Sequence, residues 1–361
     1  WPTCMCIATC RSDEVRARGR SEPMSESNPI TCNLDLDAPG KHAGTLDLVH
    51  SDNQHSMGVI PVPIAVINNG PGPTALVTAG NHGDEYEGQV IVRDLFHALT
   101  PGDITGRLIL MPALNYPAML DNHRVSPLDG GNMNRSFPGD PSGGPTAVIA
   151  HYLDSVLFPL CDGGIDLHSG GRQAHYVNCA FACLADDAEL SAANMAMAEA
   201  FGAPFTYVMH GRDAGSGLDP AANRQGTPFI SAELSGGGGV DRHAVALGAA
   251  GTRRLLVHLG VLKAEPEEPA PNTQFVTGIE ALAAPFSGIF AAAIDKGERV
   301  TAGQIAGTLY SVEELERAPE VLHVPADGVV IARPAPARVR RGTHLCLISR
   351  ETDRATLLGE I

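Results

Sequence analysis

The sequence predicts an α/β protein in which a mainly parallel, mixed sheet is flanked by helices, followed by a small all-β domain. Over residues 57–262, short apolar runs alternate with longer segments of helical periodicity. Such alternation is typical of βαβ units, whose parallel strands are covered on both faces. A segment rich in Pro and Glu, KAEPEEPAPNTQF (263–275), then precedes a stretch with Gly at short intervals. The change of pattern indicates two domains joined by an extended linker.

The individual elements follow from local patterns along the chain. The segment MGVIPVPIAVINNG (57–70) predicts a strand that ends in a turn, and TALVTAG (74–80) predicts a more buried strand. Residues 87–99 predict a helix, because Ile91 and Leu95 recur at helical spacing. Further strands are expected at 107–114, 163–170, 176–185, 205–210 and 228–235, and further helices at 146–160, 188–202 (ended by Gly202) and 243–262.

The C-terminal residues 276–361 predict a β-rich domain, because short apolar pairs alternate with glycine-containing turns. This rhythm resembles the barrel-sandwich fold of lipoyl and biotinyl carriers. Lys296, however, does not lie in the Met-Lys hairpin tip that a carrier lysine occupies. We therefore expect a structural or lid role for this domain. A non-catalytic carrier or binding module is the alternative from a different functional class.

The composition narrows the classes of function. The 361 residues carry a formal net charge of −16, and such an acidic surface repels phosphate backbones and anionic lipid, so neither nucleic acid nor a membrane is expected as a partner. No run approaches about 18 apolar residues, so no transmembrane helix is expected. Beyond residue 23, the cysteines are scattered and odd in number, which favours reduced thiols in a cytoplasm. They are Cys32, Cys161, Cys179, Cys183 and Cys346.

Residues 1–23 are interpreted as a non-native or disordered tail. They do not begin with Met, and they lack the order of a secretory signal, so Met24 is the expected natural start. A metal site at Cys4, Cys6 and Cys10 is the alternative, although no fourth ligand follows at a zinc-ribbon spacing. The predicted parts are therefore a tail (1–23), a catalytic α/β domain (24–262), a linker (263–275) and a C-terminal domain (276–361).

Metal-binding residues follow two of the predicted strands. One strand leads into His82-Gly83-Asp84-Glu85, and another leads into Asp166-Leu167-His168. Both segments are expected at the same edge of the sheet, where sites gather beyond the carboxyl ends of the strands. Two imidazoles and one carboxylate leave a tetrahedral zinc ion with one open position, which is a catalytic arrangement. We predict one Zn²⁺ per chain at His82, Glu85 and His168. Asp166 either orients a ligand imidazole or caps a turn.

Four motifs together resemble the succinylglutamate desuccinylase/aspartoacylase family, which is related to zinc carboxypeptidases. They are His82-x-x-Glu85, Asn134-Arg135 within NMNRSFPG, Asp166-Leu167-His168 and Glu233 within SAELSGG, in the family's order. The resemblance covers residues 55–350 approximately. It implies a zinc carboxypeptidase-like sheet and a zinc-dependent amidohydrolase that acts on carbon-nitrogen bonds in linear amides.

Amide hydrolysis also needs a proton carrier, a group that polarises the carbonyl and groups that bind the substrate. Four further polar residues are candidates for these roles. Glu233 ends a strand, where a carboxylate can take a proton from water and pass it to the leaving amine, and the resemblance implies this role. The resemblance makes Arg124 the polariser of the carbonyl, although its spacing to Asn134 is longer than in aspartoacylase. Arg135 suits a substrate carboxylate because its planar fork donates two parallel hydrogen bonds, and Asn134 adds a neutral one. Surface salt bridges are the alternative for both arginines.

The stretches GNHGDEYEG, RVSPLDGGNMNRSFPGD and DLHSGG look like the subfamily that deacetylates N-alpha-acetyl-L-2,4-diaminobutyrate in ectoine degradation. We therefore expect a cytoplasmic zinc deacylase with a small N-acyl amino acid as its substrate. The enzymatic alternatives are a succinylglutamate desuccinylase or aspartoacylase, an esterase, or a carboxypeptidase acting on peptides. The four glycines after Ser235 form either a flexible flap or a tightly packed turn. A homo-oligomer is left open.

Overall fold

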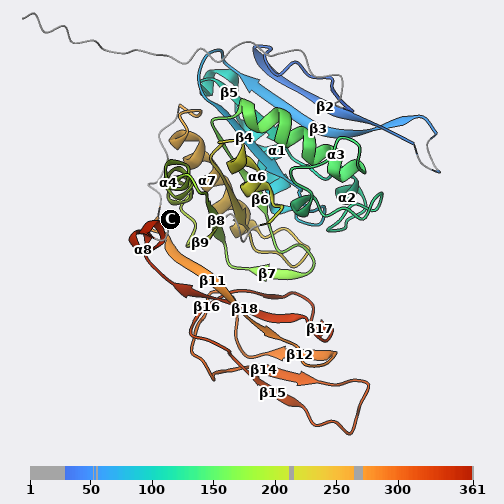
Figure 1. The fold of residues 1–361 in the computed structure, drawn as a ribbon, viewed down its shortest axis with the longest axis vertical. Helices are drawn as coiled ribbons and strands as arrows, with labels where there is room; N and C mark the ends of the chain where they lie inside the picture. The colour runs from blue at the N-terminus through green and yellow to red at the C-terminus, as the bar shows by residue number, and fades with distance from the viewer. Residues whose placement is uncertain (1–28, 52, 54–55, 211–214, 264–270, 360–361) are drawn as a thin grey trace, which may run out of the picture.

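The computed structural model describes residues 29–51, 53, 56–210, 215–263 and 271–359 (Figure 1). The predicted tail at 1–23 and residues 264–270 of the predicted linker lie outside the described residues. The same holds for the alternative metal site at Cys4, Cys6 and Cys10. The division of the chain into four parts therefore stays a prediction.

A mixed sheet of 14 strands runs through the described part of the chain. Its central strands β5, β4, β6 and β10 are parallel to one another, as their continuous apolar runs predict. Strand β8 then runs antiparallel to β10, so the sheet is mixed. In spatial order the strands are β1 (Ile30–Cys32), β2 (Gly40–His50), β3 (Gly58–Asn68), β5 (Arg107–Met111), β4 (Thr74–Ala79), β6 (Gly163–His168), β10 (Phe229–Glu233), β8 (Cys179–Leu184), β9 (Phe205–His210), β11 (Gln274–Ala283), β18 (His344–Glu351), β16 (Gly328–Pro334) and β13 (Arg299–Val300), and β7 (Ala174–Tyr176) pairs with β16.

Helices cover both faces of the central strands (Figure 1). One core joins the sheet to α1 (Glu87–Ala98), α4 (Ala188–Phe201) and α7 (Arg242–His258). On the other face, a second core contains α3 (Pro145–Tyr152) and α6 (Leu218–Arg224). The predicted α/β class, with a large mixed sheet between helices, is confirmed. Two short helices add to these cores. Leu357 of α8 (Arg354–Gly359) belongs to the first core, and Tyr116 of α2 (Tyr116–Leu120) packs against the second.

The ends of α4 match the signals in its sequence. The side chain of Asp187 accepts hydrogen bonds from the backbone N–H groups of Glu189 and Leu190, which have no partner within the helix. Gly202 ends the helix in the left-handed conformation, with φ of 70°, which a residue with a side chain adopts only at a cost. The predicted end at Gly202 is therefore confirmed.

Several predicted elements differ from the observed ones at their ends, and two of them show the physical reason. The strand expected at 107–114 ends at Met111, because Pro112 has no N–H for the ladder. The helix expected at 146–160 is α-helical over Pro145–Tyr152, continues as a π-turn over Leu153–Leu157 and ends in a 3₁₀ turn, Phe158–Leu160. Pro159 cannot donate to an α-helical ladder, which accounts for the end of the regular helix nearby.

The C-terminal strands extend the large sheet and form a second one. Strand β11 pairs in parallel with β9, and β18 and β16 follow it. A four-stranded sheet contains β15 (Glu320–His323), β14 (Ile305–Tyr310), β12 (Gly288–Ala292) and β17 (Arg338–Val339). Figure 1 shows these strands away from the helical layers. Within the described residues, no helix is both long enough and apolar enough to cross a membrane.

Candidate metal centre and substrate cavity

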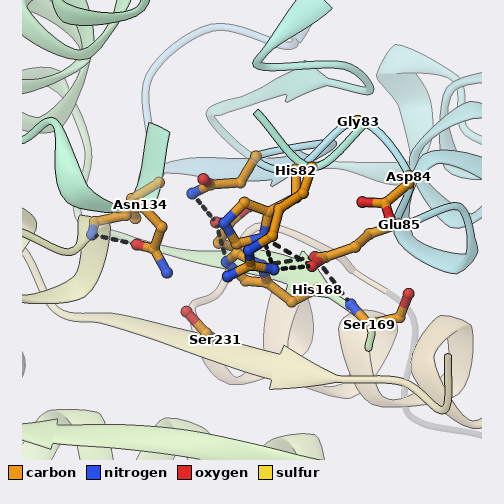
Figure 2. A network of polar contacts seen from close by, with 12 residues as sticks. His82, Gly83, Asp84, Glu85, Asn134, His168, Ser169 and Ser231 are labelled. Atoms are coloured by element: carbon orange, nitrogen blue, oxygen red, sulfur yellow. Dashed lines mark hydrogen bonds and ion pairs between the residues drawn. The ribbon is translucent and has the colours of Figure 1, made fainter. Parts of the chain in front are cut away.

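His82, Glu85 and His168 come together at the carboxyl ends of β4 and β6. Nδ1 of His82 lies 2.7 Å from one oxygen of Glu85, and Nδ1 of His168 lies 2.9 Å from the other. The three side chains are buried, and one ligand atom from each lies within 4.8 Å of the others. Figure 2 shows both imidazoles turned toward the Glu85 carboxylate. The structure thus brings together the three predicted metal ligands.

The outer nitrogens of both imidazoles face oxygen atoms. Nε2 of His82 lies 3.1 Å from Oδ1 of Asn132. Nε2 of His168 lies 2.8 Å from Oδ2 of Asp166, an ion-pair contact that is too bent for a well-aligned hydrogen bond. An oxygen beside Nε2 favours the tautomer with the proton on that nitrogen, which leaves a lone pair on Nδ1. Three electron-pair donors then converge, and this donor set fits a zinc ion.

The charges around this cluster favour a cation. Burial acts to raise the pKa of Glu85, but the imidazoles of His82 and His168 lower it well below its ordinary value. Burial acts to lower the pKa of His168, but the carboxylates of Asp166 and Glu85 outweigh it and hold this pKa well above its ordinary value. Buried carboxylates therefore surround the imidazoles and stabilise positive charge at this point.

The turn that carries His82 and Glu85 depends on close backbone packing. A Cβ atom on Gly83 would lie 2.0 Å from the carbonyl carbon of Ala118 in α2. No side chain fits there without movement of the helix. Glycine at position 83 therefore lets the turn pass beneath α2 and point both ligands inward.

Arg124 and Glu233, the two predicted catalytic residues, lie beside the cluster. Nη1 of Arg124 lies 3.1 Å from both His82 Nδ1 and the nearer Glu85 oxygen. Glu233 ends β10 in register with His168 on β6. Burial, followed by the negative charge of Glu85, raises the pKa of Glu233 to about 8. Since Oε2 of Glu233 is buried without a hydrogen-bond partner among the described residues, this carboxyl can exchange a proton with a ligand.

The predicted substrate-binding residues Asn134 and Arg135 line the same cavity, which has a volume of about 330 Å³. Asn134 also has a structural contact, because its Oδ1 accepts a hydrogen bond from the backbone N–H of Leu218 at the start of α6. Arg135 is exposed, and its guanidinium donates to the backbone oxygen of Asn134. The acidic chain therefore has a locally cationic cavity wall at Arg124 and Arg135.

The first two glycines after Ser235 pack against strand β7. A Cβ on Gly236 would lie 2.3 Å from the carbonyl oxygen of Ala174, and one on Gly237 would lie 2.3 Å from the ring of His175. Gly239, in contrast, has no atom within 4 Å of such a position. Of the two alternatives for this run, close packing describes its first part.

Several residues in or beside the cavity were not identified from the sequence. Asn132, which contacts His82, lies two residues before Asn134, and Ser231 lies two residues before Glu233 on the same face of β10, so both had a local signal. Asp219 had none, because it is a single acidic residue in α6. The apolar wall of the cavity comes from Tyr176, Phe181, Tyr207, Met209 and Ile279.

Comparison with known proteins identifies relatives across most of the chain. The N-alpha-acetyl-L-2,4-diaminobutyric acid deacetylase of Halomonas elongata is 38% identical over 329 residues, covering 90% of this chain and 96% of the relative. A product-bound structure of the ectoine utilization protein EutE (DoeB) from Ruegeria pomeroyi has a TM-score of 0.86 at 36% identity and covers 90% of this chain and 99% of that chain. The structure of a succinylglutamate desuccinylase from a Silicibacter species also has a TM-score of 0.86 at 36% identity. The match covers 90% of this chain and 99% of that chain.

The family model for the succinylglutamate desuccinylase/aspartoacylase catalytic domain matches residues 71–259. This segment contains the whole His82–Glu85–His168 cluster together with Arg124, Arg135 and Glu233. The chain therefore belongs to the succinylglutamate desuccinylase/aspartoacylase family and is an amidohydrolase that acts on linear amides.

Proposed function

We propose that this chain is a zinc-dependent deacylase that releases acetate from N-alpha-acetyl-L-2,4-diaminobutyrate in the cytoplasm. The observation that carries the proposal is that one ligand atom each from His82, Glu85 and His168 lies within 4.8 Å of the others, beside a cavity lined by Arg135 and Glu233. The substrate is suggested by the name of the Halomonas elongata relative. His82, Glu85 and His168 are the residues that would hold one Zn²⁺ per chain.

Zinc at this position would lower the pKa of water from 15.7 to about 7 and polarise a carbonyl group. The chain's own residues supply the remaining steps. Glu233 takes a proton from the attacking water and delivers it to the leaving amine as the C–O bond forms and the C–N bond breaks. The cation of Arg124 stabilises the oxygen on which negative charge develops. Its position 3.1 Å from Glu85 supports this role.

Arg135 and Asn134 are proposed to hold the substrate. The exposed guanidinium of Arg135 would bind the free carboxylate of the amino acid, where its planar fork donates two hydrogen bonds. The Nδ2 group of Asn134 would add a third, because its Oδ1 already accepts from Leu218. These contacts orient the amide toward Glu233 without taking part in the chemistry.

The C-terminal residues 276–361 are proposed to form a barrel-sandwich-like lid domain rather than a carrier. Ile279 of β11 lines the cavity, and Nζ of Lys296 donates to Oγ of Ser235, 3.1 Å away, just beyond β10. A lysine held in this way is not presented for modification at a hairpin tip. A cavity of about 330 Å³ is at the lower end of the range for small-molecule sites, which favours a single amino acid over a peptide.

The test is acetate release by zinc-loaded protein from N-alpha-acetyl-L-2,4-diaminobutyrate. It is compared with acetate release from N-acetylaspartate, succinate release from N-succinylglutamate and release of C-terminal residues from peptides. We expect the diaminobutyrate derivative to have the highest kcat/KM. The variant Glu233→Gln serves as the background control, because it preserves the shape of the side chain. Faster cleavage of peptides, or no acetate release from the diaminobutyrate derivative, would contradict the proposal.

A further inference from the structure

The cavity contains an acidic residue for which the proposed chemistry has no use. Asp219 is the second residue of α6 and lines the cavity together with Glu233 and Arg135. Its Oδ1 accepts a hydrogen bond of 2.6 Å from Oγ of Ser231. Among the described residues, no Lys or Arg forms an ion pair with Asp219, and Ser231 is its single hydrogen-bond partner. The carboxyl is thus held in place without an ion-pair partner among the described residues.

Ionising a partly buried carboxyl that has no ion-pair partner costs free energy unless a ligand provides the opposite charge. Burial raises the pKa of Asp219 to about 7, and the hydrogen bond from Ser231 only partly opposes this. The half-buried side chain of Asp219 lines the cavity as well as contacting Ser231. A cationic ligand group beside Asp219 would favour the ionised carboxylate and pair with it away from bulk water.

The distance between Ser231 and Glu233 along β10 is similar to the length of a short substrate. Ser231 and Glu233 are two residues apart on one strand face, about 6.6 Å along the strand. Ser231 fixes Asp219 at the first position, and Glu233 delivers its proton to the leaving nitrogen at the second. In a 2,4-diamino acid, four bonds of about 1.5 Å separate the two nitrogens, giving a reach of about 5 Å. One nitrogen can therefore lie near Glu233 while the other contacts Asp219.

We propose that Asp219, positioned by Ser231, binds the side-chain ammonium group of the substrate and makes the cavity selective for N-acyl amino acids with a short cationic side chain. This inference rests on the proposed deacylase function. It deepens that function, because it names a substrate-binding residue and the charge that the residue selects. A second carboxylate on the ligand, as in N-acetylaspartate, would be repelled by Asp219, so the same residue acts against acidic side chains.

The experiment compares two substrates of equal shape and different charge. N-acetyl-L-norvaline carries a methyl group where N-alpha-acetyl-L-2,4-diaminobutyrate carries its ammonium. For wild-type protein we expect kcat/KM to be at least 100-fold higher for the cationic substrate. In Asp219→Asn, kcat/KM for the cationic substrate should fall at least 30-fold, chiefly through KM, and that for the norvaline derivative should change less than threefold. Ser231→Ala should change selectivity in the same direction by a smaller factor, and the exposed Asp186→Asn should change neither substrate.

Two further readouts separate the possible failures. Zinc content should be equal in wild type and Asp219→Asn, and calorimetry should show that the wild type binds L-2,4-diaminobutyrate more tightly than L-norvaline, whatever the turnover. Equal kcat/KM for the two substrates in the wild type, or equal losses for both in Asp219→Asn, would overturn the role of Asp219 and leave the deacylase function intact. Absence of acetate release from both substrates by folded, zinc-loaded wild type would overturn the deacylase function, and this inference with it.

Discussion

The carboxylate of Asp166 lies 2.8 Å from Nε2 of His168, while Nδ1 of the same ring faces Glu85 at 2.9 Å. Asp166 is itself fixed, because Oγ1 of Thr78 and Nδ2 of Asn81 donate to its two oxygens at 2.7 and 2.8 Å. The ring of His168 is therefore held between two carboxylates. Of the two roles open to Asp166, this contact favours the orientation of a ligand imidazole.

Replacing Asp166 with Asn should weaken metal binding without removing a ligand. The amide keeps the shape of the side chain but loses the charge that makes His168 a better donor, so we expect zinc affinity to fall about 10- to 100-fold. Competition with a chromophoric chelator measures this affinity. Asp162→Asn is the matched control, because Asp162 precedes β6 and contacts the backbone of Thr74 instead. Equal affinities in wild type and Asp166→Asn would refute the orienting role.

Variants should distinguish the residues that bind the metal from the residue that transfers a proton. His82→Ala and His168→Ala should each lose stoichiometric zinc, because two ligands rarely retain the ion at a site built for three. Glu233→Gln should keep zinc and lose turnover by about 10²- to 10⁴-fold, the usual contribution of a general base. Elemental analysis and acetate release provide the two readouts. Full zinc content in both histidine variants would show that the cluster is not the metal site.

The charge state of Glu233 should appear in the stability of the metal-free protein. Its pKa is raised from 4.5 to about 8 in the folded state, so the folded protein retains a proton that the unfolded chain has lost between these values. The stabilisation is complete below about pH 4.5 and is lost as the pH rises through about 8. The Tm of wild type should therefore fall more between pH 6 and 9 than that of Glu233→Gln, by about 2 °C or more. Parallel pH profiles would contradict the raised pKa.

Substrate binding should depend on the shape of the Arg135 side chain as well as on its charge. In Arg135→Lys, the planar fork is replaced by a point charge, so the paired hydrogen bonds to a carboxylate are lost. We expect KM for the N-acetyl amino acid to rise about tenfold with a smaller change in kcat. Arg299→Lys is the control, because Arg299 pairs with Glu351 in the C-terminal strands. A loss confined to kcat would place Arg135 in the chemistry instead.

Asp129 should stabilise the loop that carries Asn132 and Arg135. Its carboxylate accepts hydrogen bonds from the backbone N–H groups of Thr146, at the start of α3, and Gly131. Burial acts to raise the pKa of Asp129, but these hydrogen bonds outweigh it and lower the pKa. Asp129→Ala should therefore reduce the free energy of unfolding by about 1 kcal/mol at pH 7.

The sign of the pKa shift gives this prediction a pH dependence. Because the pKa of Asp129 is lowered, its stabilisation is present above its ordinary pKa of 3.8 and is lost as the pH falls through the lower folded value. The difference between wild type and Asp129→Ala in urea denaturation should narrow toward acid pH. Asp140→Ala, which removes a single contact to Ser142, serves as the control. A constant difference down to pH 3 would contradict this account.

Sequence patterns predicted those elements whose side chains are buried on a regular repeat. Strand β4 is buried at every position and helix α4 has both a capping Asp and a terminal Gly, so each was predicted from local residues. Strand β2 was not, because most of its residues are only half-buried or exposed and it is held chiefly by pairing with β3. Pairing between strands depends on partners elsewhere in the chain, and no local periodicity contains that information.

The same distinction applies to the site. His82 and Glu85 follow the end of one strand and Glu233 is the last residue of another, so their motifs predicted them. The structure brings them to one place. Asp219 belongs to a helix of seven residues on the opposite face of the sheet from α1. Its relation to Ser231 arises only when α6 packs against β10. The residue that we propose for substrate selection therefore could not be predicted from local sequence, because its position depends on tertiary packing.

The hydrogen-bonded junction between β9 and β11 has a practical consequence for protein engineering. Because the C-terminal strands continue the ladder of the catalytic part, a chain cut at residue 262 would expose the edge of β9 that pairs with β11, at residues 205–208. It would also remove the partner of β7, the strand that follows His168 closely in sequence. A shortened chain of this kind is expected to aggregate on expression, so a minimal version of the enzyme should be sought by trimming the loops of the outer four-stranded sheet instead.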